Sequence, residues 1–205
     1  MKTHLFHCDH PPRVLEVGVD RGVTFISLVA FLARCKDSFT VVGIDVRVQE
    51  QVQIVLNNLD LTSTQCAYLL EDNSLKVLPQ MAAGGPLWDL VLIDGDHNYH
   101  TVSEELKVLE GLVEEGGMVV IDDYEGRWSE RDLFYAEREG YENNPKVTPK
   151  VNTTKHGVKT AVDEFLAREG SKWDVSQPVQ GEPIMLVRKP TAIVSLPSII
   201  IDDKD

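Results

Sequence analysis

Residues 88–99, WDLVLIDGDHNY, decide the fold of this chain. They contain a short apolar run, residues 90–93, which follows a Gly-Gly-Pro turn signal and stops at the polar sequence DGDH. Such a run is typical of a strand buried on both faces of a parallel sheet. Ligands of open α/β sheets bind outside the carboxyl ends of the strands, so we expect Asp94, Asp96 and His97 at a functional site. A helix N-cap and a turn are the alternative, because Asp, Gly and Asn favour both.

A second strand, residues 118–121, ends in the same way, with Asp122 and Asp123 directly after it. If the two strands are neighbours, their ends lie about 5 Å apart. Carboxylates that close repel one another unless a cation or a proton intervenes. A hard divalent ion, magnesium, manganese or calcium, fits ligation by oxygen atoms. The alternative is that these carboxylates face water or cap a helix.

Upstream, residues 13–19 (RVLEVGV) predict the first strand, and an apolar helix follows over residues 23–35. Gly18 and Gly22 lie between them, and glycines there let the backbone approach a ligand at the helix amino end. This is the frame of a nucleotide-binding βαβ unit, but its E-x-G-x-x-x-G pattern is not the G-x-G-x-x-G fingerprint of NAD enzymes. Glu16 would also repel a diphosphate, so a cationic ligand suits this strand end better.

A second βα unit follows, with a strand over residues 39–46 that ends at Asp45. Asp45 stands at the distance at which an acid binds ribose hydroxyls, with a helix N-cap as the alternative. Residues 71–74 (EDNS) cap a further helix and could also present a hydrogen-bonding group to a base. The remaining elements predicted from periodicity and turn signals are helices at 49–59, 75–81, 100–113, 130–139 and 158–168, and strands at 65–70, 173–175 and 184–188.

Residues 125–155 interrupt this alternation with aromatic side chains, arginines, Asn and Pro. A long insertion beside a strand's carboxyl end is commonly a lid or substrate loop, and a dimer interface is the alternative. At the amino end His4, His7, Cys8 and His10 could hold zinc, but their terminal position favours a surface arm. We therefore expect an arm over residues 1–12, one domain over 13–189 that includes the insertion, and a tail over 190–205.

Composition narrows the function classes. The 205 residues are 42% hydrophobic, which suits one domain, and the formal net charge of −13 argues against a nucleic-acid partner. Three cysteines without metal-ligand spacing predict reduced thiols. No signal peptide is recognisable and no segment approaches the ~20 apolar residues of a membrane helix, so we expect a soluble, cytoplasmic protein without a membrane partner.

Taken together, residues 13–189 resemble a class I S-adenosylmethionine-dependent methyltransferase. LEVGVDRGVT resembles the first motif of that family, and IDV resembles the second. The pair DLVLIDGDHNY and GGMVVIDDY resembles a group of metal-dependent small-molecule O-methyltransferases, which includes sugar and macrolide-tailoring enzymes and cephalosporin-hydroxylase-like proteins. The resemblance implies an α/β fold: a Rossmann-like, doubly wound, seven-stranded sheet, mostly parallel with a C-terminal antiparallel strand.

The resemblance also implies site residues. Those expected to bind S-adenosylmethionine are Glu16, Gly18, Gly22, Asp45, Asp72, Asn73 and Asp94. Asp94, Asp122 and Asp123 are expected to hold a divalent metal, with magnesium first and manganese or calcium as alternatives. The sequence departs from the family at Asp20 and Asp72, where relatives carry glycine.

The expected reaction is methyl transfer to a hydroxyl of a small molecule, with Asp94 and His97 as catalytic residues. His97 is a possible general base, or it caps the following helix or orients Asp94. Closure over the substrate is expected from residues 125–155 or from a second subunit of a homodimer. The alternatives are a metal-independent methyltransferase and a non-catalytic cofactor-binding module.

Overall fold

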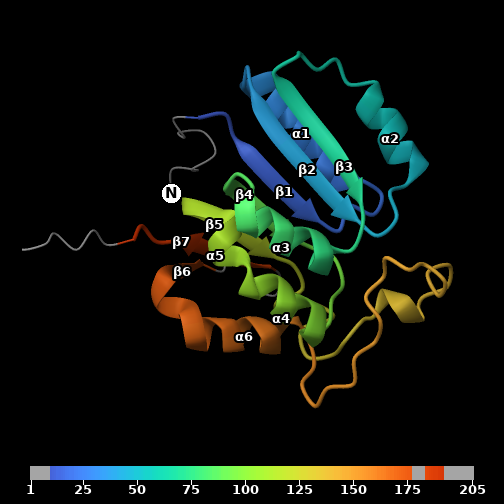
Figure 1. Cartoon of the computed structure of the whole chain (residues 1–205), viewed down its shortest axis with the longest axis vertical. Coiled ribbons are helices and arrows are strands. Elements are labelled where there is room, and N and C mark those ends of the chain that lie inside the picture. Colours follow the sequence, from blue (N-terminus) through green and yellow to red (C-terminus); the bar gives the residue numbers. More distant parts are fainter. Residues whose placement is uncertain (1–9, 177–182, 192–205) are drawn as a thin grey trace, which may run out of the picture.

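One seven-stranded sheet organises the chain in this computed structural model, which describes residues 10–176 and 183–191 (Figure 1). The strand order is β3-β2-β1-β4-β5-β7-β6. The strands are β1 Arg13–Val17, β2 Phe39–Asp45, β3 Gln65–Glu71, β4 Trp88–Ile93, β5 Val113–Ile121, β6 Trp173–Ser176 and β7 Ile184–Arg188. β1 to β5 pair in parallel, whereas β7 is antiparallel to both β5 and β6. The predicted fold class is confirmed.

Helices cover both faces of the sheet. They are α1 Val23–Cys35, α2 Glu50–Asn57, α3 Ser74–Gly84, α4 Tyr99–Lys107, α5 Leu109–Leu112 and α6 Val158–Glu169. Successive strand residues point to opposite faces. Val14 accordingly joins a buried cluster with Phe25 of α1 and Val52 of α2. The next residue, Leu15, joins a second cluster with Leu106 of α4 and Val162 of α6. The chain therefore builds one hydrophobic core on each face.

The strand register brings Asp94 and Asp122 together at the carboxyl ends of the central strands. β1 and β4 pair Val17 with Ile93, and β4 and β5 pair Ile93 with Ile121. The hydrogen-bond ladder continues one residue further: Asp94 N–H donates to Val17 C=O at 2.8 Å, and Asp122 N–H donates to Ile93 C=O at 3.0 Å. The carboxyl ends of β1, β4 and β5 therefore end level with one another.

Two predicted helices differ from the structure. The helix expected over residues 100–113 is interrupted at Val108, and β5 already begins at Val113. Residues 113–117, which precede the strand predicted over 118–121, already belong to β5; Gly116 has φ 79° and the register with β4 shifts in this part of the strand.

The helix expected over residues 130–139 is only a 3₁₀ turn, η2 Tyr135–Glu137. The reason is that backbone N–H groups here bond to a distant loop. Leu133 N–H donates to His97 C=O, and Tyr135 N–H donates to the Asp96 carboxylate. A second 3₁₀ turn, η3 Gly170–Lys172, follows α6.

The two C-terminal strands are present as predicted, but most of their connection lies outside the described residues. So do His4, His7, Cys8 and nearly all of the predicted tail. Within the described ranges, no helix combines the length and the apolar character needed to cross a membrane.

Candidate active site

A hollow lies at the carboxyl ends of the central strands. Four groups of residues line it: Val17, Gly18 and Asp20 after β1; Ile44, Asp45 and Val46 at the end of β2; Asp72, Asn73 and Ser74 before α3; and Asp94, Gly95 and Asp96 after β4. The insertion adds Tyr135, Tyr141, Val147 and Thr148. Five of the predicted cofactor residues line this hollow, whereas Glu16 and Gly22 do not.

Gly18 brings β1 and β4 into close contact. Its φ is 88°, and a Cβ at this position would lie 2.0 Å from the carbonyl oxygen of Asp94. No other residue fits without displacing a strand end. Gly22 has a packing role instead, because a Cβ there would lie 2.6 Å from a methyl of Val52 on α2.

The Asp45 carboxylate organises the loop after β1. It accepts hydrogen bonds from the backbone N–H groups of Val19 and Asp20, both at 2.9 Å, and of Arg47 at 2.8 Å. The alternative of a helix cap does not hold, because the N-cap of α2 is Gln49. Asp45 therefore shapes the glycine loop and also faces the hollow.

Glu16 is buried in the sheet between Gly43 of β2 and Leu92 of β4. Its side chain is 2% exposed, and its Oε2 has no hydrogen-bond partner among the described residues. Burial, followed by the charges of Asp94 and Asp45, raises its pKa to about 8. We expected an ionised carboxylate facing a cation, but near neutral pH this group is mostly protonated and lies outside the hollow's lining.

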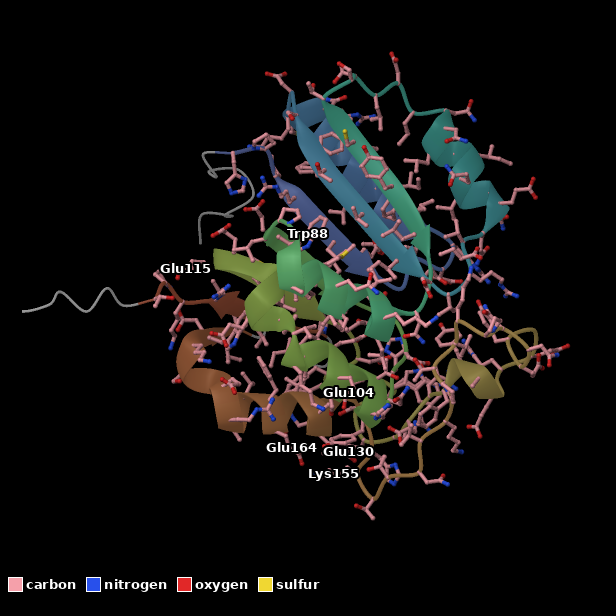
Figure 2. All side chains as sticks on the ribbon, in the orientation of Figure 1. Trp88, Glu104, Glu115, Glu130, Lys155 and Glu164 are labelled. Carbon is pink, nitrogen blue, oxygen red and sulfur yellow. The ribbon has the colours of Figure 1, made fainter. Side chains whose placement is uncertain are left out.

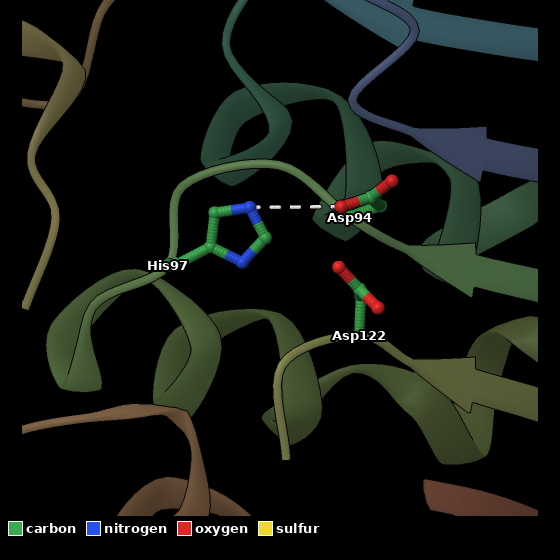
Figure 3. Close-up of side chains that lie close together, drawn as sticks. All are labelled: Asp94, His97 and Asp122. Atoms are coloured by element: carbon green, nitrogen blue, oxygen red, sulfur yellow. Dashed lines mark ion pairs between the residues drawn. The ribbon is translucent and has the colours of Figure 1, made fainter. Parts of the chain in front are cut away.

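Asp94, His97 and Asp122 converge at the ends of β4 and β5 (Figure 3). Each offers one ligand atom, and the three atoms lie within 4.8 Å of one another. His97 Nε2 is 3.6 Å from Asp94 Oδ1, whereas His97 Nδ1 is 3.3 Å from Asp123 Oδ2. Asp123, expected as a third carboxylate ligand, lies outside this group on the opposite side of the imidazole. Its backbone is left-handed, with φ 57°.

The charges in this cluster are strongly coupled. Burial, and then the charge of Asp122, raise the pKa of Asp94 to about 8, although 47% of its side chain is exposed. Two carboxylates so close together cannot both ionise freely, and this favours the protonated form of Asp94. Burial lowers the pKa of His97 and the charge of Arg138 adds to this, against the opposing effects of Asp123 and Asp122. His97 is therefore neutral near pH 7 and can accept a proton or a metal.

Asp96 joins the sheet edge to the insertion. Its carboxylate accepts from Tyr135 N–H at 2.9 Å and from the Thr101 hydroxyl at 3.3 Å, and burial raises its pKa to about 6. The N-cap of α4 is Asn98, whose Oδ1 accepts from Thr101 N–H. The helix cap expected as an alternative for this loop is therefore Asn98, the residue directly after DGDH.

Asn73 also holds the insertion. Its Oδ1 caps α3, while its Nδ2 donates to the Lys146 carbonyl at 2.7 Å and to the Thr148 hydroxyl at 3.1 Å. The amide predicted to contact a base is therefore engaged within the protein.

Tyr135 and Tyr141 form the aromatic part of the hollow, with ring centroids 5.2 Å apart in an edge-to-face arrangement. The sequence marked these aromatics as candidates, but no local signal showed that they line the same hollow as Asp94.

A protein-family model described as a methyltransferase domain matches residues 15–124, more than half of the chain. The chain belongs to this methyltransferase family. The match runs from β1 through the carboxylates after β5, so it contains Gly18, Asp45, Asp94 and Asp122.

Solved structures share the fold of this methyltransferase at low sequence identity. CalS11, a TDP-rhamnose 3'-O-methyltransferase of calicheamicin biosynthesis, is 17% identical with a TM-score of 0.57, covering 87% of this chain and 73% of its own. MycE from the mycinamycin pathway, in complex with Mg and SAH, is 16% identical with a TM-score of 0.55, covering 93% of this chain and 48% of its own. The SAH-bound Podospora anserina methyltransferase PaMTH1 is 17% identical with a TM-score of 0.53, covering 88% and 73%. A comparison with curated proteins found no match.

The class I S-adenosylmethionine-dependent methyltransferase expected from the sequence is confirmed. The family favours an enzyme over a non-catalytic cofactor-binding module. The roles of the individual site residues stay predictions.

Proposed function

We propose that this methyltransferase transfers the methyl group of S-adenosylmethionine to a hydroxyl oxygen of a small molecule, assisted by a divalent cation. One observation carries the proposal: Asp94, His97 and Asp122 converge beside a hollow at the carboxyl ends of the strands. The natural-product O-methyltransferase CalS11 and the magnesium complex of MycE have the same fold, which supports this choice.

The hollow suits a cationic cofactor. Within the described part of the chain, its lining includes five aspartates and no lysine or arginine. A sulfonium and an amino group would be attracted to such a lining, whereas a diphosphate would be repelled. Asp45, as an acceptor at the end of β2, is the residue that we assign to the ribose hydroxyls.

The donor set beside the hollow fits a divalent cation. Two carboxylates and a neutral imidazole suit Mg²⁺ or Mn²⁺, and the imidazole makes Ca²⁺, which prefers oxygen ligands, a poorer fit. A cation between Asp94 and Asp122 would relieve the repulsion that helps raise the pKa of Asp94. We assign Asp123 to orient His97 through Nδ1, as carboxylates commonly do behind a metal-binding histidine.

The sulfonium already activates the methyl group, so the protein mainly has to align the attacking oxygen with it. A bound cation would act as a Lewis acid that lowers the pKa of the acceptor hydroxyl. The chain contributes Gly18, whose lack of a side chain lets the end of β1 lie against the Asp94 backbone. His97 would hold the cation through Nε2 while Nδ1 faces Asp123, so the hydroxyl proton passes to water rather than to the imidazole. Without a cation, His97 Nε2 is free to take up that proton.

The test uses S-adenosylmethionine with an isotope-labelled methyl group and a panel of sugar, catechol and macrolide hydroxyl acceptors. The expected result is label on an acceptor oxygen with Mg²⁺ or Mn²⁺, and loss of transfer in excess EDTA that is reversed by the metal. Amine analogues of the same acceptors are included, and label found only on their nitrogen atoms would contradict the hydroxyl assignment.

A metal-independent methyltransferase is the second candidate, and one observation favours it. A protonated Asp94 can hydrogen-bond to Asp122, so the cluster is stable without a cation. Full activity in EDTA, with Asp94 and Asp122 still required, would select this mechanism.

A further inference from the structure

One arginine beside the hollow has guanidinium N–H donors without a hydrogen-bond acceptor among the described residues. Arg138 follows η2 and is exposed, and its guanidinium group has no hydrogen-bond or ion-pair partner among the described residues. The insertion's three lysines, by contrast, all pair with glutamates: Lys146 with Glu71, Lys150 with Glu137, and Lys155 with Glu164. Figure 2 labels Lys155 and Glu164 on the side of α6 away from the sheet.

Arg138 contacts Tyr135, one of the residues that line the hollow. Its Cζ is 5.2 Å from the ring centroid of Tyr135, which lines the hollow and whose N–H binds Asp96. The guanidinium therefore lies against a side chain that lines the hollow and whose backbone is hydrogen-bonded to the loop after β4.

The other arginines of this region are either hydrogen-bonded or lie on Trp128, which does not line the hollow. Arg47 donates from Nη1 to the Gly140 carbonyl at 3.1 Å and stacks on Tyr141. Arg127 and Arg131 both contact the ring of Trp128, and Arg131 Nε donates to the Arg127 carbonyl. The two acidic residues next to Arg138 in the sequence do not pair with it: Glu137 pairs with Lys150, and Glu139 forms no ion pair with Arg138.

This arrangement has a consequence for the acceptor. The formal net charge of −13 and the aspartates of the hollow repel anions, so an anionic acceptor could approach only where a cation faces it. A guanidinium with free donors binds carboxylate or phosphate oxygens in a bidentate fork. Stacking on Tyr135 holds that fork at the side of the hollow.

We propose that Arg138 binds a carboxylate or phosphate group of the acceptor, so that the enzyme selects acidic hydroxyl compounds over their neutral counterparts. This inference rests on the proposed function, because it names the substrate class of the same site. Arg138 is then a residue that determines substrate specificity, whereas the catalytic groups remain Asp94, His97 and Asp122.

The test measures binding of paired probes to the full chain loaded with S-adenosylhomocysteine and Mg²⁺. Catechol is compared with 3,4-dihydroxybenzoate, and glucose with glucose 6-phosphate, by calorimetry. We expect one acidic member to bind at least tenfold tighter than its neutral counterpart, and the pair that shows this distinguishes carboxylate from phosphate. Arg138→Gln should remove that preference, whereas the matched control Arg131→Gln should retain it.

Equal binding within both pairs, no binding of either acidic probe, or a preference that survives in Arg138→Gln would overturn the proposal. Methyl transfer to the same probes is measured in parallel. An acid preference without transfer to any hydroxyl would count against the proposed function and leave Arg138 as the anion contact. Transfer without an acid preference would retain the function and reject the role of Arg138. Where transfer occurs, Arg138→Gln should raise the KM of the acidic acceptor at least tenfold and change kcat by less than threefold.

Discussion

The sheet edge and the insertion enclose the same hollow, but they are built in different ways. At the sheet edge, Asp94 and Asp122 are fixed by backbone hydrogen bonds that continue the β-ladder. The insertion has only a 3₁₀ turn of regular structure over residues 125–157, and side chains hold it in place. Asp96 and Asn73 bind its backbone directly.

This difference suits two separate tasks: aligning the reacting groups and selecting the substrate. Groups that must be aligned with a methyl group are best placed on rigid strand ends, because small displacements there cost large factors in rate. Groups that choose a substrate can lie on a loop that varies without disturbing the sheet. Asp94 and Asp122 accordingly lie directly after the strand ends and His97 lies in the short loop between β4 and α4, whereas Arg138 lies on the insertion.

The largest effect is expected from Asp122→Asn. Loss of one charged ligand should lower kcat/KM at least 100-fold, about 2.7 kcal/mol, while the Kd of S-adenosylmethionine changes less than threefold because Asp122 does not line the hollow. Methyl-transfer kinetics and calorimetry measure the two quantities. Asp123→Asn is the matched comparison and should lose about tenfold, through the orientation of His97. Equal losses in the two variants would contradict the assignment of Asp123 as an orienting residue.

The next largest effect is expected from Asn73→Ala, which removes hydrogen bonds that hold the insertion. Asn73→Ala removes the cap of α3 and two hydrogen bonds to the insertion, so the free energy of unfolding should fall by about 2–3 kcal/mol. Urea denaturation measures this loss, and limited proteolysis should show faster cleavage within residues 133–148. Asn58→Ala is the control, because the Asn58 side chain makes only an exposed hydrogen bond to Ile54. Unchanged proteolysis would show that other contacts suffice to hold the insertion.

The free energy of unfolding is expected to depend on pH through Glu105, a buried residue of α4. Glu105 of α4 is 1% exposed and accepts a hydrogen bond from the Ser74 hydroxyl, and burial raises its pKa from 4.5 to about 8. Between these values the folded state keeps a proton that the unfolded chain releases. The stability due to this group is therefore full below pH 4.5 and is lost as the pH rises towards 8, at up to about 1.4 kcal/mol per pH unit.

Glu105→Gln cannot titrate and should remove that part of the slope when unfolding is measured at pH 5.5, 6.5 and 7.5. Glu104→Gln, on the same helix but exposed and paired with Lys107, should leave the slope unchanged. A slope as steep in Glu105→Gln as in the wild type would mean that Glu105 is ionised in the folded state.

The smallest effect is expected from Lys146→Ala. Its ammonium pairs with Glu71, but the two side chains are 34% and 43% exposed, so the free energy of unfolding should change by less than about 0.5 kcal/mol. The backbone carbonyl of the same residue still accepts from Asn73 in this variant. A loss as large as that of Asn73→Ala would show that surface charge, rather than the buried amide, holds the insertion.

The sequence predicted the sheet edge well because its signals are local. A short apolar run that stops at a carboxylate predicts both a buried strand and the residue at its end, as in Ile93-Asp94 and Ile121-Asp122. The helix expected over residues 130–139 was wrong for the opposite reason. Its backbone groups bond to Asp96 and His97, more than 30 positions earlier, and no local pattern reports such partners.

By itself, the sequence determined the order of the strands and of most helices, and the placing of carboxylates directly after two of the strands. Hydrophobic periodicity and turn chemistry act over a few residues, and that range is enough for these features. Only the tertiary structure decided that His97 joins Asp94 and Asp122 while Asp123 faces the other ring nitrogen of His97, that Asn73 hydrogen-bonds to the insertion, and that Arg138 lies on Tyr135 with unpaired donors. The direction of a side chain after a strand depends on one backbone angle and on partners distant in sequence, and both are fixed only when the chain has folded.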